Sequence, residues 1–181
     1  MARRIIITAG HNGLGTGAKS EWLDEGAETI VLRDLITEKL RERGVTVYND
    51  PNALPLRGVI AWIRRQFKAK DILVEIHFNA GPPTAKGTEC FVENNFTKEE
   101  YNLANLLCRT TVNATKGAIQ NRGVKTAKDS QHSRLGILED TTTTSVLWEV
   151  CFLSNKPEVF NYVFNREKMA TQVADLLTLA Q

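Results

Sequence analysis

The chain has 181 residues, a length that suits one domain with a substantial core and is short for two domains. Its hydrophobic fraction of 42%, charged fraction of 24% and net charge of +2 are ordinary for a soluble globular protein. The small net charge gives no reason to expect nucleic acid as a partner, and the basic stretch 64–70 fits the cation-rich end of a helix.

The predicted elements alternate between strands and helices along the chain. Strands are expected at 3–8, 44–49, 71–80, 88–94, 134–140 and 145–152, and helices at 25–43, 56–69, 97–115, 154–164 and 166–180. The segments 9–24 and 116–133 read as long loops. Apolar strands covered on both sides predict an α/β fold: a single three-layer domain over residues 1–181, with a mixed, largely parallel sheet of about six strands.

Membrane insertion and export are not expected from the sequence. No segment approaches the roughly 18 apolar residues of a membrane helix, and the N-terminal apolar run is too short for a signal peptide. We therefore expect a protein that is made in the cytoplasm. A monomer is also expected. The cysteines Cys90, Cys108 and Cys151 are widely spaced in apolar surroundings, which predicts reduced core thiols.

Two of the three histidines follow or end predicted strands. His11 comes just after the first strand, and His77 lies near the end of the third. Parallel strands present their carboxyl ends to one crevice, where both imidazoles could meet, although a histidine in such a place is often an ordinary core or loop residue. A catalytic zinc ion usually takes three protein ligands, so a carboxylate is needed nearby.

Three glutamates are candidates for that carboxylate. Glu25 leads because it opens the helix that follows the His11 loop, while Glu21 and Glu28 are rivals on position alone. A glutamate at a helix start is also favoured by the helix dipole without any metal. The position of Glu25 is therefore consistent with a ligand and with a surface residue.

An isolated acid interrupts the apolar stretch "SVLWEVCF". Glu149 in this stretch must be paired, face a cleft or be protonated, because a carboxylate is costly to bury alone. Beside a zinc site it would serve as a general base and then as a general acid. The neighbouring loop "GHNGLG" matches neither phosphate-binding motif, and we interpret Gly10 and Gly13 as residues that let the backbone turn sharply around His11.

Four segments in order resemble one known family over essentially the whole chain. They are "IIITAGHNGLGTGA", "EGAETIVLRDLITEKLRERGVTVY", "KDILVEIHFNA" and "VLWEVCFLSN", and they are similar to segments of the zinc-dependent N-acetylmuramoyl-L-alanine amidases of the type 3 class. The resemblance implies one zinc ion held by His11, Glu25 and His77, with Glu149 as the catalyst. It also implies peptidoglycan as the substrate, cleaved at the amide between the lactyl group of muramic acid and L-alanine of the stem peptide.

Several positions depart from the family pattern or lie outside it. Asn12, Glu75 and Cys151 replace a glycine, a serine and a glycine of the family. Glu75 could orient the His77 ring as a hydrogen-bond acceptor, or point outward. His132 is either a solvated loop residue or a contact for the stem peptide at the cleft rim, and Asn79 is a candidate for supporting substrate binding.

Two other functions stay open from the sequence. One is a zinc peptidase or carboxypeptidase that acts on stem peptides, and the other is an inactive relative that only binds the cell wall. The absence of an export signal and of a wall-binding domain suits a compact phage-type lysin that other factors release to the wall. A bacterial autolysin would more often carry such a signal.

Overall fold

Six strands form one mixed sheet in the computed structural model, which describes residues 3–13, 15–132 and 134–180. The strand order is β2-β1-β3-β6-β4-β5. The strands are β1 (Ile5–Ala9), β2 (Val47–Asn49), β3 (Ile72–Asn79), β4 (Thr88–Val92), β5 (Asn121–Thr126) and β6 (Thr144–Phe152). The first four in the spatial order are parallel, β4 runs antiparallel to β6, and β5 is parallel to β4. The expected mixed, largely parallel sheet is confirmed.

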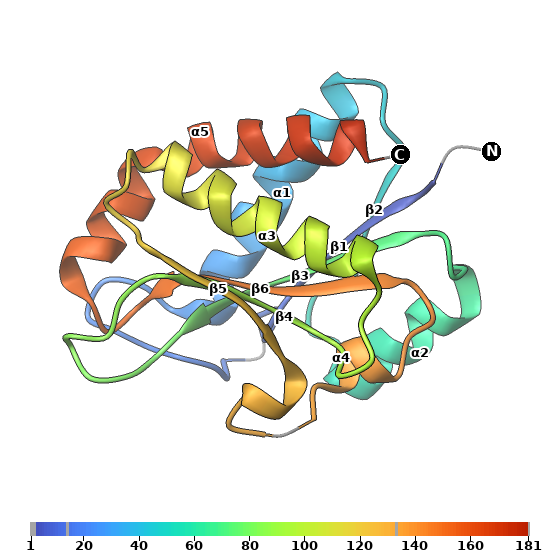
Figure 1. Cartoon of the computed structure of the whole chain (residues 1–181), viewed down its shortest axis with the longest axis horizontal. Coiled ribbons are helices and arrows are strands. Elements are labelled where there is room, and N and C mark those ends of the chain that lie inside the picture. The colour runs from blue at the N-terminus through green and yellow to red at the C-terminus, as the bar shows by residue number, and fades with distance from the viewer. Residues whose placement is uncertain (1–2, 14, 133, 181) are drawn as a thin grey trace.

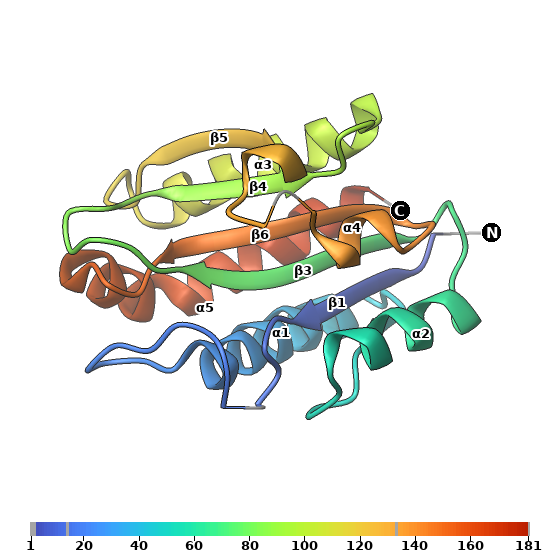
Figure 2. The same ribbon diagram turned by 90° about the horizontal axis from the view of Figure 1, so that it is seen from below.

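Helices cover both faces of the sheet, which gives the expected three layers (Figures 1 and 2). The long helices α1 (Glu25–Glu42), α3 (Lys98–Ala114) and α5 (Lys156–Leu179) pack on one face. The shorter α2 (Leu56–Gln66) and α4 (Gly136–Glu139) lie on the other face, and a 3-10 turn, η1 (Ala127–Asp129), follows β5. No helix in the described part of the chain is long and apolar enough to cross a membrane.

Alternation along the strands separates two cores. Ile5, Ile72 and Val146 face the long helices, while Ile6, Leu73 and Leu147 face α2 and α4. The second face is apolar near the start of the parallel strands and carries acids and a histidine toward their carboxyl ends. This polarity change places a chemically distinct region on one face of the sheet.

Three sequence-based predictions about elements were wrong. The expected loop 116–133 contains β5, an edge strand that has no fully buried residue and begins with Asn, Arg and Gly, so it lacks the apolar alternation of a buried strand. The expected strand 134–140 contains the short helix α4, because its apolar residues pack into the α2 core instead of pairing with a strand. The two expected C-terminal helices are one continuous helix, α5, since neither Gly nor Pro separates them.

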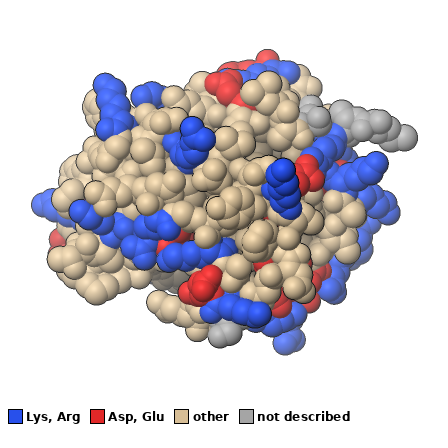
Figure 3. Space-filling model, viewed as in Figure 1, with Lys and Arg blue, Asp and Glu red and all other residues tan. Residues whose placement is uncertain are grey.

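The surface and the thiols agree with the composition. Lys and Arg side chains are spread over the face seen in Figure 3, with Asp and Glu among them, in keeping with the small net charge. Cys90, Cys108 and Cys151 are all buried free thiols, as predicted. Burial raises the pKa of the Cys151 thiol well above its usual value, so this residue is a core group in its neutral form.

Candidate metal centre and its cleft

Three predicted ligands come together at the carboxyl end of the parallel strands. His11 follows β1, Glu25 is the first residue of α1, and His77 lies on β3. One ligand atom from each residue lies within 4.8 Å of the others. Strands β1 and β3 are parallel neighbours, so the turn after β1 and the end of β3 meet at one edge, as the sequence predicts.

The Glu25 carboxylate lies between the two imidazoles and is fixed by the backbone. Its Oε1 is 3.0 Å from Nδ1 of His77 and accepts a hydrogen bond of 3.0 Å from the Phe78 N–H. Its Oε2 accepts a 2.6 Å bond from the Ala18 N–H and lies 3.7 Å from Nε2 of His11. Burial opposes the charged form, but His77 and these N–H donors outweigh it and lower the pKa of Glu25.

Two glycines make room for the side chains of the three candidate ligands. A Cβ on Gly10 would lie 2.4 Å from Cε1 of the His77 ring, and one on Gly17 would lie 2.6 Å from Oε2 of Glu25. Gly10 lies in the turn after β1, as predicted, and it also lets the His77 ring approach the backbone. Gly13, with φ of 84°, does have the left-handed conformation of a sharp turn, and so does His11 itself at 58°.

Glu149 stands beside this cluster on the neighbouring strand. Its Cα is the register partner of His77 across β3 and β6, and its Oε2 is buried without a hydrogen-bond partner among the described residues. Burial is the largest influence and raises the pKa of Glu149 to about 7; the nearby His77 lowers it, while the charges of Glu25, Glu89 and Glu75 raise it further. A carboxyl group with this pKa can both take up and release a proton near neutral pH.

The donor set fits a zinc ion. Two imidazole nitrogens and one carboxylate oxygen are ligands that catalytic zinc takes, with a further position left for water or substrate. The close approach of the His77 ring to Gly10 and of Glu25 to Gly17 shows that the backbone is shaped around these side chains. Nδ1 is the nitrogen of His77 that would coordinate the ion, since it faces Glu25 while the opposite Nε2 lies 3.4 Å from Glu75.

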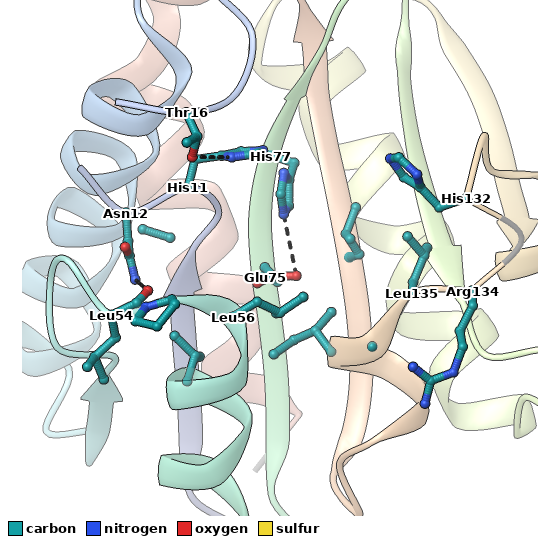
Figure 4. A pocket seen from close by; sticks show the side chains of 16 residues that line it. His11, Asn12, Thr16, Leu54, Leu56, Glu75, His77, His132, Arg134 and Leu135 are labelled. Carbon is teal, nitrogen blue, oxygen red and sulfur yellow. Dashed lines mark hydrogen bonds and ion pairs between the residues drawn. The ribbon is translucent and has the colours of Figure 1, made fainter. Parts of the chain in front are cut away.

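A cleft extends from the metal centre in two directions. One compartment is mainly apolar and is lined by residues of the α2 and α4 side together with Glu75 (Figure 4). The other is polar and includes Glu149 and side chains of β4 and β5. The two compartments share five lining residues, which are His11, His77, His132, Leu135 and Leu147. The metal centre therefore lies where an apolar and a polar surface meet.

Cationic side chains in the polar compartment were missed at the sequence level. Glu89 accepts bonds of 2.5 Å from Nε of Arg122, 2.6 Å from Nζ of Lys125 and 3.0 Å from Nδ2 of Asn79. Burial opposes its charge, yet Lys125 and Arg122 lower the pKa of Glu89. Arg122 and Lys125 belong to β5, which the sequence analysis expected to be loop, so no register could place them beside the cleft.

The remaining candidates have defined places. His132 is exposed and lies across the cleft from His11 in Figure 4, where it lines both compartments. Asn79 lines the polar compartment. Their contacts with a substrate stay predictions. Thr16, which the sequence analysis did not consider, has its hydroxyl 3.0 Å from Nδ1 of His11.

The rival carboxylates lie away from the metal centre. Glu28 is buried between α1 and α5, where its Oε1 accepts bonds of 2.8 Å from the Tyr162 hydroxyl and 3.0 Å from Arg166. Glu21 is exposed in the segment before α1. Of the three glutamates, Glu25 is the one that joins the histidines.

The Asn12 side chain also points away from the candidate ligands, and it holds the turn after β1 through hydrogen bonds to other segments. Its Nδ2 donates bonds of 3.0 Å to Oδ2 of Asp50 and 3.0 Å to the carbonyl of Leu54. Asp50 is in turn paired with Arg33 at 3.0 Å. Asn12 therefore anchors the turn that carries His11 to β2 and the segment before α2, a role that the family glycine could not perform with a side chain.

Comparison with known proteins identifies the family. The family described as N-acetylmuramoyl-L-alanine amidase matches residues 5–178, so the chain belongs to this family of amidases, which degrade the peptidoglycan of the cell wall. The chain is 28% identical over 160 residues to the uncharacterized protein YqiI of Bacillus subtilis (strain 168), covering 86% of this chain and 73% of that protein.

Solved structures show the same fold. The N-acetylmuramoyl-L-alanine amidase AmiC2 of Nostoc punctiforme matches with a TM-score of 0.80 and 21% identity, over 99% of this chain and 98% of that one. An N-acetylmuramoyl-L-alanine amidase of Clostridium difficile 630 matches with a TM-score of 0.77 and 24% identity, over 99% and 94% of the two chains.

Proposed function

We propose that this chain is a zinc-dependent N-acetylmuramoyl-L-alanine amidase that acts as a single catalytic domain over residues 1–181 and uses one zinc ion. Its substrate is the amide between the lactyl group of N-acetylmuramic acid and L-alanine of the stem peptide. The observation that carries the proposal is the convergence of His11, Glu25 and His77, with Glu149 as the register neighbour of His77. Membership of the amidase family supports the choice of bond.

The three ligands and Glu149 have separate tasks in this proposal. His11, Glu25 and His77 would hold zinc, which when bound polarises a carbonyl and lowers the pKa of water. Glu149 takes the proton of the water that attacks the amide carbon, and its pKa of about 7 suits this task near neutral pH. It then gives that proton to the alanine nitrogen as the carbon–nitrogen bond breaks. The products are a free lactyl carboxyl group and a peptide with a free amine.

Substitution of the base and of a ligand separates chemistry from metal binding. Glu149→Gln should retain zinc and lose turnover of purified peptidoglycan by about 10³-fold, because a general base typically contributes 10²–10⁴-fold. His77→Ala should lose both zinc and turnover. Zinc content by atomic emission and release of amines from peptidoglycan are the measurements. A Glu149→Gln variant with wild-type turnover would refute the assignment.

Product analysis tests the choice of bond. An amidase exposes the amine of L-alanine and leaves the glycan chains intact, while a zinc peptidase or carboxypeptidase exposes amines or carboxyl groups within the stem. An inactive wall-binding relative would bind peptidoglycan, release no amines and hold no zinc. Mass spectrometry of the soluble products therefore distinguishes all three functions.

A further inference from the structure

Glu75 is a buried carboxylate in the apolar compartment of the cleft. It lies on β3 two residues before His77, so both side chains project from the same face of the sheet. It is 5% exposed, and its register partners on the neighbouring strands are Thr8 and Leu147. Glu75 replaces the serine of the amidase pattern that the sequence resembles.

The Glu75 carboxylate contacts the outer nitrogen of a metal ligand. Its Oε2 lies 3.4 Å from Nε2 of His77, a contact drawn as a dashed line in Figure 4. The other ring nitrogen, Nδ1, is 3.0 Å from Oε1 of Glu25 on the metal side. The His77 ring is therefore placed between two carboxylates, one of them a ligand and the other directly behind the ring.

This contact is the one ion pair of Glu75 among the residues that the structure describes. Burial of a carboxylate without a donor costs stability, and the surrounding compartment is mainly apolar. A purely structural role does not account for such a residue, because an apolar side chain would fill the space at lower cost. The contact with Nε2 of His77 explains why a carboxylate lies at this position.

The second histidine provides an internal comparison. The outer nitrogen of His11, Nδ1, lies 3.0 Å from the neutral hydroxyl of Thr16. Each imidazole thus has a partner behind it, but only His77 has an anionic one. An imidazole that binds metal through one nitrogen carries its proton on the other, and a carboxylate acceptor for that proton fixes the tautomer and makes the ring a stronger ligand.

We propose that Glu75 is a positioning residue of the metal centre. Its carboxylate accepts the Nε2 proton of His77, keeps Nδ1 free for zinc and strengthens zinc binding. The inference rests on the proposed zinc site and adds to it a residue that acts through His77 and does not touch the metal or the substrate. Because partners of this kind typically contribute 10–100-fold to metal affinity, the effect is large enough to measure directly.

The test compares zinc affinity with the stability of the metal-free protein. Zinc is removed with a chelator, and its dissociation constant is measured by competition with a chromophoric chelator for the wild type, Glu75→Leu and Glu75→Gln. We expect zinc binding to weaken about 10–100-fold in Glu75→Leu and less in Glu75→Gln, whose amide oxygen can still accept the proton. The metal-free Glu75→Leu protein should unfold at the same temperature as the wild type or higher, because a buried carboxylate has been removed.

Thr8→Val is the matched control. Thr8 is the register partner of Glu75, and its hydroxyl is buried without a hydrogen-bond partner among the described residues. This change alters the same part of the sheet without touching His77, so the zinc affinity should stay within about twofold of the wild type, a margin far below the effect of an outer carboxylate. Replacement of zinc by cobalt adds a second readout, since the visible spectrum should shift in Glu75→Leu and not in Thr8→Val.

Two results would overturn the inference. One is a zinc affinity in Glu75→Leu and Glu75→Gln equal to that of the wild type. The other is a loss of affinity that accompanies an equal loss of stability in the metal-free protein, which would make Glu75 a structural residue. If Glu75→Leu does not fold, Glu75→Gln and its unfolding temperature decide between these outcomes. A wild-type protein that binds no zinc would instead refute the proposed function, and the inference with it.

Discussion

The two compartments that meet at His77 use carboxylates in opposite ways. In the apolar compartment, Glu75 faces the outer nitrogen of His77 and has a partner for its charge. In the polar compartment, Glu149 has a buried oxygen with no hydrogen-bond partner in the described part of the chain, and its pKa is raised to about 7. A buried glutamate whose carboxylate is paired with a ring nitrogen can hold that ring in place. A buried glutamate whose carboxylate lacks a hydrogen-bond donor stays available for proton transfer.

The walls of the two compartments differ as much as their carboxylates. The apolar wall offers van der Waals contact through residues such as Leu54, Val59 and Ile137. The polar wall has two cations, Arg122 and Lys125, which both pair with Glu89. These two side chains could also meet a carboxylate of the substrate beside the candidate metal centre. Since only the peptide half of the proposed substrate carries carboxylates, we expect the stem peptide to lie along the polar wall.

The largest expected effect comes from filling the space between Gly10 and the His77 ring. In Gly10→Ala, the new Cβ would lie 2.4 Å from the His77 ring, so the ring must leave its position between Glu25 and Glu75. We expect zinc affinity and turnover to fall by more than about 100-fold, in line with the loss of a ligand and its outer partner.

Gly58→Ala is the matched control for this substitution. A Cβ on Gly58 in α2 would meet Leu54 at an ordinary 3.5 Å, so zinc content and activity should not change. Atomic emission and amine release measure both variants. Wild-type zinc content in Gly10→Ala would contradict the tight packing of the ring against the backbone.

An intermediate effect is expected from the polar wall. Arg122→Gln and Lys125→Met should each raise KM about tenfold, with a smaller change in kcat, because a lost charge contact typically costs about 1–2 kcal/mol. The effect should shrink on peptidoglycan whose stem carboxylates are amidated.

Lys128→Gln tests whether any nearby cation would serve. Lys128 is exposed in η1, just beyond β5, so its loss should leave KM unchanged. Steady-state kinetics on matched amidated and non-amidated substrates give the comparison. Equal losses on both substrates would show that Arg122 and Lys125 act on the fold of the cleft and do not contact a carboxylate.

An effect on stability, and not on zinc binding or turnover, is expected for Glu149 in the metal-free protein. The pKa of Glu149 is about 7 in the folded state and near 4.5 when unfolded, so the unfolded chain loses its proton first and stability falls as pH rises between these values. Glu149→Gln removes this cost. The variant should exceed the wild type in unfolding free energy by about 3 kcal/mol at alkaline pH and by much less near pH 5. Urea unfolding at both pH values is the measurement, and a gain independent of pH would be inconsistent with the raised pKa.

Much of the candidate metal centre was predictable because its residues lie at element ends or interrupt apolar strands. His11 follows a short apolar strand, Glu25 opens a helix, and Glu149 interrupts an apolar strand, so each has a local signal. Parallel pairing then brings these signals together. The three residues that the structure brings together are the ones that the family resemblance implied as ligands.

The parts that escaped prediction depend on packing between segments that are distant in the chain. Edge strand β5 has no fully buried residue and lacks apolar alternation, so the positions of Arg122 and Lys125 could not be derived. The apolar residues of α4 fit a strand equally well until α2 provides their partner. The role of Gly10 depends on its contact with the His77 ring on β3, and this contact cannot be predicted from the turn propensity of glycine.

The way in which Glu25 is held has a thermodynamic consequence. Its carboxylate accepts the N–H groups of Ala18 and Phe78, which belong to the segment before α1 and to the end of β3. Ordering of that segment and capture of the metal are therefore linked, and each must favour the other by the same free energy. In the proposed zinc enzyme, a partner that orders Ala18 against Phe78 would raise the affinity for zinc, and release of zinc would loosen the segment before α1.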